Sequence, residues 1–280
     1  MQGEAGWGAN RFFAGLISFY SNCIKRHSKK SIKLAKMENQ VKAMPQYKRI
    51  LLKLSGESLA GPGGQGIDPA MLNTYAEEIR SLTRHGIEVG VVLGGGNIFR
   101  GLQGMGKGVD RVQGDYMGML ATVINSMALQ SALEALEVQA TVLSGMPIEP
   151  VAKKMNRRDA TALLEAGQVV IMAGGTGNPF FTTDSAAALR GVEIRADVLL
   201  KGTRVDGVYT ADPEKDPGAR KYDTLSFDQA YRENLRIMDL TAFTLCREND
   251  LPIIVFNINK KGILYEMLVE GKVAGTLVSN

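Results

Sequence analysis

The amino-acid sequence predicts an α/β fold built around a mainly parallel sheet. From Tyr47 onward, apolar runs of strand length alternate with stretches that have the pattern of a helix. Strands separated by helices form right-handed βαβ units, which place the strands parallel. Three clusters of glycine follow apolar runs, at the carboxyl ends of strands where parallel sheets bind their ligands. The alternation therefore predicts the fold and also the position of a phosphate or nucleotide site.

The individual elements follow from residue type and spacing. Seven apolar runs have the length of strands, the last as an edge strand: residues 49–54, 87–93, 140–143, 168–172, 197–201, 252–258 and 275–278. Six segments have helical patterns: residues 69–83, 115–136, 159–166, 185–190, 227–234 and 240–249. Asp68 before Pro69 suits the N-cap of the first helix, and Thr183 or Asp184 suits the N-cap of the fourth.

The charge of the chain is unevenly distributed. The 280 residues include 33 Lys and Arg against 29 Asp and Glu, a net charge of +4. Residues 1–46 hold eight of the basic residues and two of the acidic ones, which leaves 25 basic and 27 acidic residues in 47–280. A nucleic-acid-binding domain would be expected to carry its basic patch on the folded part. The charge therefore disfavours binding of nucleic acid.

Residues 1–46 are expected to form a poorly ordered basic N-terminal extension to a folded domain at 47–280. The apolar run 12–20 is shorter than the roughly 20 residues that span a bilayer. Most positive charges follow this run, whereas a secretory signal has them before it. Met37 suits a second start just before the folded region. A targeting or membrane-surface role is the alternative, but we expect no membrane association.

Cysteine and histidine are too scarce for several common active sites. Cys23 and Cys246 lie far apart and form no disulfide framework, which suits a reducing cytosol. His27 and His85 are the only histidines, so a zinc site is disfavoured. His85 stands before Gly86 in what resembles a helix C-terminus, and this disfavours a Ser-His-Asp hydrolase.

Two segments resemble common nucleotide-binding motifs but depart from them at essential positions. Residues 101–108 approach the P-loop, but Gly108 replaces the Ser or Thr that binds magnesium, and no strand directly precedes them. Residues 61–66 have the glycine spacing of the dinucleotide fingerprint, but Pro62 lacks an N–H and six residues separate Leu54 from Gly61. The sequence therefore disfavours a P-loop enzyme and a Rossmann dehydrogenase.

Two lysines stand near the ends of apolar strands, beside glycine. Lys53 precedes Ser55-Gly56, and Lys201 precedes Gly202-Thr203 in the same arrangement. A lysine in an apolar strand is costly to bury unless it meets an anion, although one in an edge strand could simply face solvent. The repeat predicts a pair of cations that neutralise a transferring phosphate. Asp184, by default a helix cap, could fix the position of either lysine.

Two loops carry groups suited to a nucleotide. Consecutive glycines at 94–96 let backbone N–H groups face phosphate oxygens, and Arg100 adds a planar donor fork. The loop 176–183, Thr-Gly-Asn-Pro-Phe-Phe-Thr-Thr, combines hydroxyls, an amide and two aromatic rings. Its polar groups could bind a small base and ribose while Phe180 and Phe181 wall the pocket.

These stretches closely resemble the bacterial UMP kinases of the amino-acid-kinase family. The matching segments, in order along about 47–280, are residues 53–56, 94–100, 114–120, 174–184 and 201–213. The resemblance implies a three-layer sandwich around a mainly parallel sheet, and a catalytic domain that makes UDP from UMP and ATP. The catalytic residues it implies are Lys53, Arg100, Asp184 and Lys201.

The resemblance also implies which residues bind each nucleotide. The expected ATP site comprises Lys53, Leu54, Ser55, Gly56, Gly96, Arg100, Thr203, Tyr209 and Asp212. The expected UMP site comprises Gly95, Asp115, Thr176, Gly177, Asn178, Pro179, Phe180, Phe181, Thr182 and Thr183. A region responsive to GTP would comprise Gly61, Pro62, Gly63, Gly64, Gln65 and Gly66.

The resemblance further implies a cytoplasmic homohexamer of pyrimidine biosynthesis, with GTP and UTP as effectors. Mg²⁺ would arrive with ATP, and no protein metal ligand is expected because no carboxylate cluster of cage type is visible. Two other activities stay open at this point. One is an amino-acid kinase that phosphorylates a carboxylate or carbamate, which the loop 176–183 disfavours. The other is a non-catalytic nucleotide sensor, which the presence of both lysines disfavours.

Overall fold

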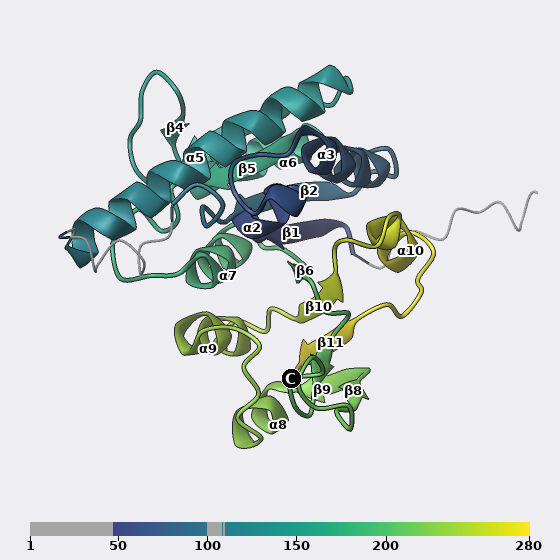
Figure 1. The fold of residues 1–280 in the computed structure, drawn as a ribbon. Coiled ribbons are helices and arrows are strands. Elements are labelled where there is room, and N and C mark those ends of the chain that lie inside the picture. Colours follow the sequence, from purple (N-terminus) through teal and green to yellow (C-terminus); the bar gives the residue numbers. More distant parts are fainter. Residues whose placement is uncertain (1–46, 100–107, 109) are drawn as a thin grey trace, which may run out of the picture. The chain divides into compact units, whose positions relative to one another are not determined.

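A nine-stranded sheet with helices on both faces organises the part of the chain that the structure describes (Figure 1). The computed structural model describes residues 47–99, 108 and 110–280, which fall in one unit spanning Pro45–Asn280. The expected extension 1–46 lies outside the described residues. None of the helices in the described ranges is long and apolar enough to cross a bilayer.

The strands of the large sheet are β1 (Arg49–Leu54), β2 (Glu88–Leu93), β3 (Ala140–Ser144), β4 (Lys153–Lys154), β5 (Val169–Ala173), β6 (Val198–Thr203), β9 (Thr224–Ser226), β10 (Ile253–Asn257) and β11 (Thr276–Ser279). A separate antiparallel pair consists of β7 (Val208–Tyr209) and β8 (Lys221–Tyr222). The helices are α2 (Gly56–Leu59), α3 (Pro69–Thr83), α5 (Arg111–Ala135), α6 (Arg157–Glu165), α7 (Thr183–Glu193), α8 (Phe227–Arg232), α9 (Leu240–Glu248) and α10 (Ile263–Leu268). The order of strands across the sheet is β4-β3-β5-β2-β1-β6-β10-β11-β9.

The core has two halves, one on each face of the sheet. In β1, Ile50, Leu52 and Leu54 pack into the half that contains α3, α5 and α10. Leu51 packs into the other half, with residues of α6, α7 and α9. Side chains of a strand alternate between its faces, and strands of a parallel sheet are apolar on both. The structure therefore confirms the three-layer, mainly parallel fold.

The same alternation places the two lysines on the face covered by α7. Lys53 shares a face of β1 with Leu51, and Lys201 shares a face of β6 with Leu199, which packs in the same half of the core as Leu51. The parallel pairing of β1 with β6 sets Lys53 directly opposite Lys201. Because β1 lies between β2 and β6, the alternative of a solvent-facing lysine on an edge strand is wrong.

Some elements differ from the sequence-based expectation. The expected edge strand at the C-terminus, β11, lies between β10 and β9, and β9 is the edge. Helix α5 begins at Arg111 rather than at residue 115, because Asp110 accepts hydrogen bonds from the first N–H groups. The N-cap of α7 is Thr182 rather than Thr183 or Asp184. Short elements such as α2, α10 and β7–β9 were not expected, because a segment of so few residues is too short to show a hydrophobic periodicity.

Candidate active site

Lys53, Asp184 and Lys201 form a nearly buried ion-pair cluster at the carboxyl ends of β1 and β6. The distance from Lys53 Nζ to Asp184 Oδ1 is 2.9 Å, and that from Lys201 Nζ to Asp184 Oδ2 is 2.7 Å. The three side chains are 12% to 16% exposed. Lys201 Nζ also donates to the carbonyl oxygen of Ile237 at 2.6 Å. The structure thus brings both sequence-predicted lysines onto one carboxylate.

Burial and charge act against each other within this cluster. Burial raises the pKa of the Asp184 carboxyl, but the ammonium groups of Lys53 and Lys201 outweigh it and hold that pKa below its ordinary value. The pKa of Lys201 is also lowered, by burial and by the charge of Lys53, and the carboxylates of Asp184 and Asp239 offset this only in part. Two cations facing one anion leave a positive charge in excess, which suits an incoming phosphate.

The first turn of α7 places Asp184. The side-chain oxygen of Thr182 accepts hydrogen bonds from the N–H groups of Asp184 at 3.0 Å and Ser185 at 3.2 Å. A hydroxyl at this position satisfies N–H groups that have no partner inside the helix. The N-terminus of a helix also favours negative charge. The local sequence Thr-Thr-Asp therefore both starts the helix and orients the carboxylate toward the lysines.

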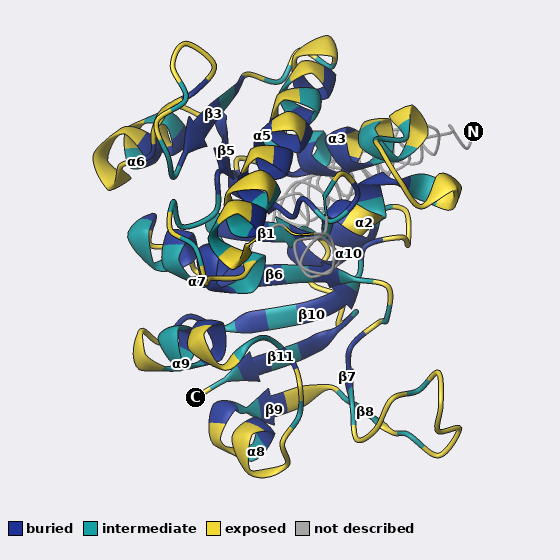
Figure 2. Ribbon diagram, turned by 60° about the vertical axis from the view of Figure 1, so that its left-hand side comes forward, coloured by how far each residue is buried: buried dark blue, intermediate teal, exposed yellow. Residues whose placement is uncertain are grey.

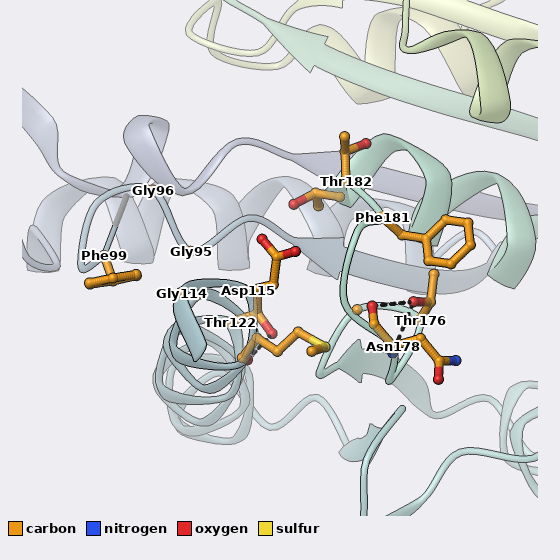
Figure 3. A pocket seen from close by; sticks show the side chains of 14 residues that line it. Gly95, Gly96, Phe99, Gly114, Asp115, Thr122, Thr176, Asn178, Phe181 and Thr182 are labelled. Atoms are coloured by element: carbon orange, nitrogen blue, oxygen red, sulfur yellow. Dashed lines mark hydrogen bonds between the residues drawn. The ribbon is translucent and has the colours of Figure 1, made fainter. Parts of the chain in front are cut away.

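A first cavity of about 350 Å³ lies between α5, the glycine turn after β2 and the loop before α7 (Figure 3). Its lining residues are Gly95, Gly96, Phe99, Gly114, Asp115, Gly118, Met119, Thr122, Gly175, Thr176, Asn178, Phe181, Thr182 and Thr183. A Cβ atom on Gly95 would lie 2.7 Å from the carbonyl oxygen of Gly118, so only glycine lets the turn approach α5 this closely. The cavity is small, with aromatic, amide and hydroxyl groups in its wall.

Asp115 connects α5 with the loop before α7. Its carboxylate accepts a hydrogen bond from the Phe180 N–H at 2.7 Å and pairs with Arg111 Nε at 2.9 Å. The Arg111 guanidinium lies over the Phe180 ring, 5.7 Å from its centre. In Figure 3 Asp115 lies between the glycine turn and the loop that carries Phe181. Asp115 therefore holds the loop and also faces the cavity.

A second cavity of about 850 Å³ borders the two lysines of the ion-pair cluster. Its lining residues are Lys53, Ser55, Glu57, Ser58, Gly61, Pro62, Gly64, Met71, Thr74, Lys201, Gly202, Thr203, Arg204, Asn259 and Lys261. Asp184 follows Thr183 of the first cavity directly in sequence, while its two lysine partners line the second. The lysines of the cluster therefore border the second cavity, and the turn that carries Asp184 borders the first, an arrangement that suits transfer between two bound molecules.

The expected site residues distribute unevenly over these cavities. Seven of the expected UMP-site residues line the first cavity: Gly95, Asp115, Thr176, Asn178, Phe181, Thr182 and Thr183. Gly177, Pro179 and Phe180 belong to the same loop but are not part of the lining. Gly96, expected at the ATP phosphates, lines the first cavity. Arg100 lies outside the described residues.

Of the residues expected to bind ATP, Lys53, Ser55 and Thr203 line the second cavity, as does the expected catalytic residue Lys201. Tyr209 and Asp212 do not line it: the Tyr209 hydroxyl donates to Asp206, and Asp212 pairs with Lys215. Gly61, Pro62 and Gly64, expected in a GTP-responsive region, form part of the cavity wall. Sequence reasoning missed Arg204 and Lys261. Arg204 lies close in sequence to the Lys201-Gly-Thr motif that was recognised, whereas no recognisable motif lies near Lys261.

A buried pair of asparagines joins the loops of both cavities to α5. Asn125 Nδ2 donates to the Gly94 carbonyl and to Asn97 Oδ1, each at 2.7 Å. Asn97 Nδ2 donates to Asn125 Oδ1 at 3.0 Å and to the Gly66 carbonyl at 2.6 Å. A Cβ atom on Gly56 would lie 2.6 Å from Asn97 Oδ1, so the loop after β1 packs on the same pair. Together these contacts fix the glycine loops relative to one another.

Replacement of Asn125 by leucine is expected to lower the free energy of unfolding by about 3 kcal/mol. The leucine leaves Asn97 Oδ1 and the Gly94 carbonyl without their partner, at about 1–3 kcal/mol for each buried polar group. Urea unfolding followed by circular dichroism measures the change, with Ser131→Ala on the exposed side of the same helix as control. Unchanged stability of Asn125→Leu would contradict the role of the pair.

Comparison with known proteins places this geometry in a family. The model of the amino acid kinase family matches residues 48–257. The uridylate kinase of Parabacteroides distasonis is 59% identical over 85% of this chain and all of its own length. That of Porphyromonas gingivalis is 56% identical over 85% of this chain and 99% of its own length.

Solved structures agree with the sequence comparison. The crystal structure of UMP kinase from Bacillus anthracis has a TM-score of 0.81 and 39% identity, and the match covers 83% of this chain and 96% of that one. The structure from Ureaplasma parvum has a TM-score of 0.80 and 39% identity, over 84% and 100% of the two chains. The resemblance drawn from the sequence is thus confirmed: the chain belongs to the amino acid kinase family and, within it, groups with the uridylate kinases.

Proposed function

We propose that this protein transfers the γ-phosphoryl group of ATP to UMP, giving UDP and ADP in pyrimidine nucleotide biosynthesis. The observation that carries the proposal is the Lys53–Asp184–Lys201 cluster, whose lysines line the second cavity and whose aspartate directly follows Thr183 of the first. Its relatives named uridylate kinase support UMP as the acceptor.

The second cavity is the proposed ATP site. Ser55 and Gly56 begin α2, and Ser55 Oγ accepts from the Glu57 N–H at 3.3 Å. The N–H groups of the glycine loops would face phosphate oxygens, with Arg100 and Gly96 beside them. Thr203 lines the cavity, while Tyr209 and Asp212 are proposed for the adenosine on family resemblance alone.

The first cavity is the proposed UMP site. The hydroxyl and amide groups of Thr176, Asn178 and Thr183 would bind the uracil and ribose, and Phe181 would pack against them. Gly95 lines the same cavity, and its N–H would meet the UMP phosphate. The cavity size suits a mononucleotide better than a longer ligand.

No general base is needed for this transfer. The acceptor oxygen belongs to a phosphate that is already anionic at neutral pH. The protein must therefore bring two polyanions together in line and neutralise the charge that builds up between them. Lys53 and Lys201 would contact the transferred group, and their ion pairs with Asp184 would hold the two ammonium groups at a fixed spacing.

Mg²⁺ is proposed to enter with ATP, bound mainly by phosphate oxygens and water. Within the described ranges no group of three or more His, Cys, Asp or Glu side chains is placed to bind a metal. When bound, Mg²⁺ would neutralise part of the charge of the phosphates.

A coupled assay for ADP tests the function directly. The chain, ATP and Mg²⁺ are combined in turn with UMP, CMP, aspartate and N-acetylglutamate. ADP formation with UMP far above the other acceptors is expected. Preferred turnover of a carboxylate acceptor would identify another amino-acid kinase, and binding of nucleotide without any turnover would identify a sensor.

Family resemblance also supports a cytoplasmic homohexamer that responds to GTP and UTP. Helix α5 carries Met117, Leu120, Ile124 and Met127 at helical spacing on one face, each 40% to 50% exposed. Figure 2 shows exposed positions along this helix. Such a contiguous apolar stripe on a surface marks an interaction site. We propose that this face contacts a second copy of the chain within the hexamer.

Ile124→Glu is therefore expected to reduce the mass of the assembly while leaving the fold intact. The position is half-exposed in the single chain, so the charge harms only a contact between chains. Light scattering after gel filtration measures the mass, which should be six times that of one chain for the unaltered protein. Equal masses of variant and unaltered protein would place the interface elsewhere.

A further inference from the structure

Asp239 connects two helices next to the ion-pair cluster. It is the N-cap of α9, and its Oδ1 accepts a hydrogen bond from the Ala242 N–H at 3.0 Å. Its carboxylate also accepts hydrogen bonds from the hydroxyls of Thr182 and Ser185 at the start of α7. The Ser185 hydroxyl lies 3.0 Å and 3.1 Å from the two carboxylate oxygens. One side chain therefore ties the N-terminus of α9 to that of α7.

The contact with Thr182 determines where its hydroxyl proton and lone pairs point. The hydroxyl donates to Asp239, so its lone pairs are left for the N–H groups of Asp184 and Ser185. A hydroxyl has one proton to donate. Without an acceptor at Asp239, that proton is free to rotate, and the Thr182 cap loses its fixed orientation.

The segment just before Asp239 holds the other side of the cluster. The carbonyl oxygen of Ile237, which is buried, accepts a hydrogen bond from Lys201 Nζ at 2.6 Å. Asp239, two residues later, holds the turn that carries Asp184, the ion-pair partner of Lys201. Residues 237–239 therefore contact Lys201 directly, through the Ile237 carbonyl, and hold Asp184 indirectly, through the hydrogen bonds of Asp239 to Thr182 and Ser185.

We propose that Asp239 is a positioning residue for phosphoryl transfer. Its carboxylate fixes the turn from Thr182 to Ser185. It thereby holds the wall of the first cavity, the proposed acceptor (UMP) site, at a fixed position relative to the Asp184–Lys201 pair. Thr182 and Thr183 line that cavity, and Asp184 follows them in the same turn. The inference rests on the proposed function, because it assigns Asp239 to the acceptor side of that reaction.

An ordinary helix cap is the competing explanation, and Asp239→Asn separates the two. Asparagine is as good an N-cap as aspartate, so the start of α9 is retained. Its amide has one acceptor oxygen instead of two, and its NH₂ group cannot accept the Thr182 proton. A capping residue alone therefore tolerates the change, whereas a positioning residue does not.

Asp239→Asn is expected to lower kcat by about 10- to 100-fold, the scale of a small misplacement of reacting groups, and to raise KM for UMP. KM for ATP should change less, because Thr182 and Thr183 line the acceptor cavity only. Asp228→Asn, an exposed acid on α8, serves as control with unchanged kinetics. Thermal unfolding should show Asp239→Asn folded at the assay temperature.

A double-mutant cycle adds a test that a structural role would not pass. Ser185→Ala alone should raise KM for UMP slightly, but it should add little in the Asp239→Asn background because both changes break the same contact. Unaltered kcat and KM in Asp239→Asn would overturn the proposal, as would losses that simply add in the cycle. Absence of UMP phosphorylation in the unaltered protein would instead refute the proposed function.

Discussion

Replacement of Lys53 by alanine is expected to lower kcat for UMP phosphorylation by about 10²–10³-fold, the cost of removing one preorganised charge at a transition state. The ammonium group lies 2.9 Å from Asp184, and the Lys53 side chain lines the second cavity. We propose that it neutralises the charge on the phosphoryl group during transfer. KM for UMP should therefore change much less than kcat, because Lys53 does not line the acceptor cavity.

The variant is expected to remain folded. Alanine leaves Asp184 paired with Lys201 at 2.7 Å, so no buried charge is left without a partner. Lys201→Ala should reduce kcat on the same scale, since the two lysines face each other across β1 and β6. Lys48→Ala is the matched control, because Lys48 lies just before the same strand at its opposite end and is 78% exposed.

Steady-state kinetics and circular dichroism decide the outcome. Near-normal turnover in Lys53→Ala or Lys201→Ala would refute a catalytic role for the cluster. Loss of turnover in Lys48→Ala to the same extent would point to a general effect of removing a positive charge.

Replacement of Asp184 by asparagine is expected to harm both activity and stability. The neutral amide leaves two ammonium groups close together without an anion, so they repel each other and move from their positions. We expect kcat to fall at least about 10²-fold, in line with loss of electrostatic preorganisation. The free energy of unfolding should fall by about 3 kcal/mol, the lower end of the range for breaking a buried pair. The lower end applies because both lysines line the second cavity and are not fully removed from solvent.

The stability effect should depend on pH with a definite sign. The pKa of Asp184 is lower in the folded protein than its ordinary value, because two lysines outweigh the effect of burial. Its carboxylate therefore stabilises the fold above the ordinary pKa of aspartate, and this stabilisation is lost as the pH falls through the folded pKa. The difference in unfolding free energy between unaltered protein and Asp184→Asn should shrink below about pH 4.

Urea unfolding at a series of pH values measures this difference. Asp159→Asn, in the first turn of α6, controls for loss of a carboxylate near a helix N-terminus. A difference that stays constant or grows as the solution becomes acidic would contradict the paired carboxylate.

Much of the fold follows from short-range patterns in the sequence. The helix at Pro69–Thr83 was predicted with its Asp68 cap and both ends, because proline and the capping aspartate act on neighbouring residues. Strand β1 was predicted likewise at Arg49–Leu54. The position of β11 was predicted but not its partners, because four residues of a strand do not encode which neighbour pairs with them.

The candidate site was predicted where its residues lie in one motif. The loop 176–183, the glycine turn and the two strand-end lysines were found because each is a local pattern with a recognisable chemistry. Asp239 and Lys261 were missed. The Asp239 side chain contacts Thr182 across 57 positions of sequence, and no local signal marks an aspartate that caps one helix and braces another.

The sequence by itself determined the alternation of strands and helices, the family, and which two lysines are the candidates for catalysis. Only the tertiary structure decided that these lysines face each other across β1 and β6 and share Asp184. The physical reason is the range of the forces involved. Hydrophobic period and capping act within a few residues, whereas the register of parallel strands and the docking of α7 depend on packing between segments far apart in the chain.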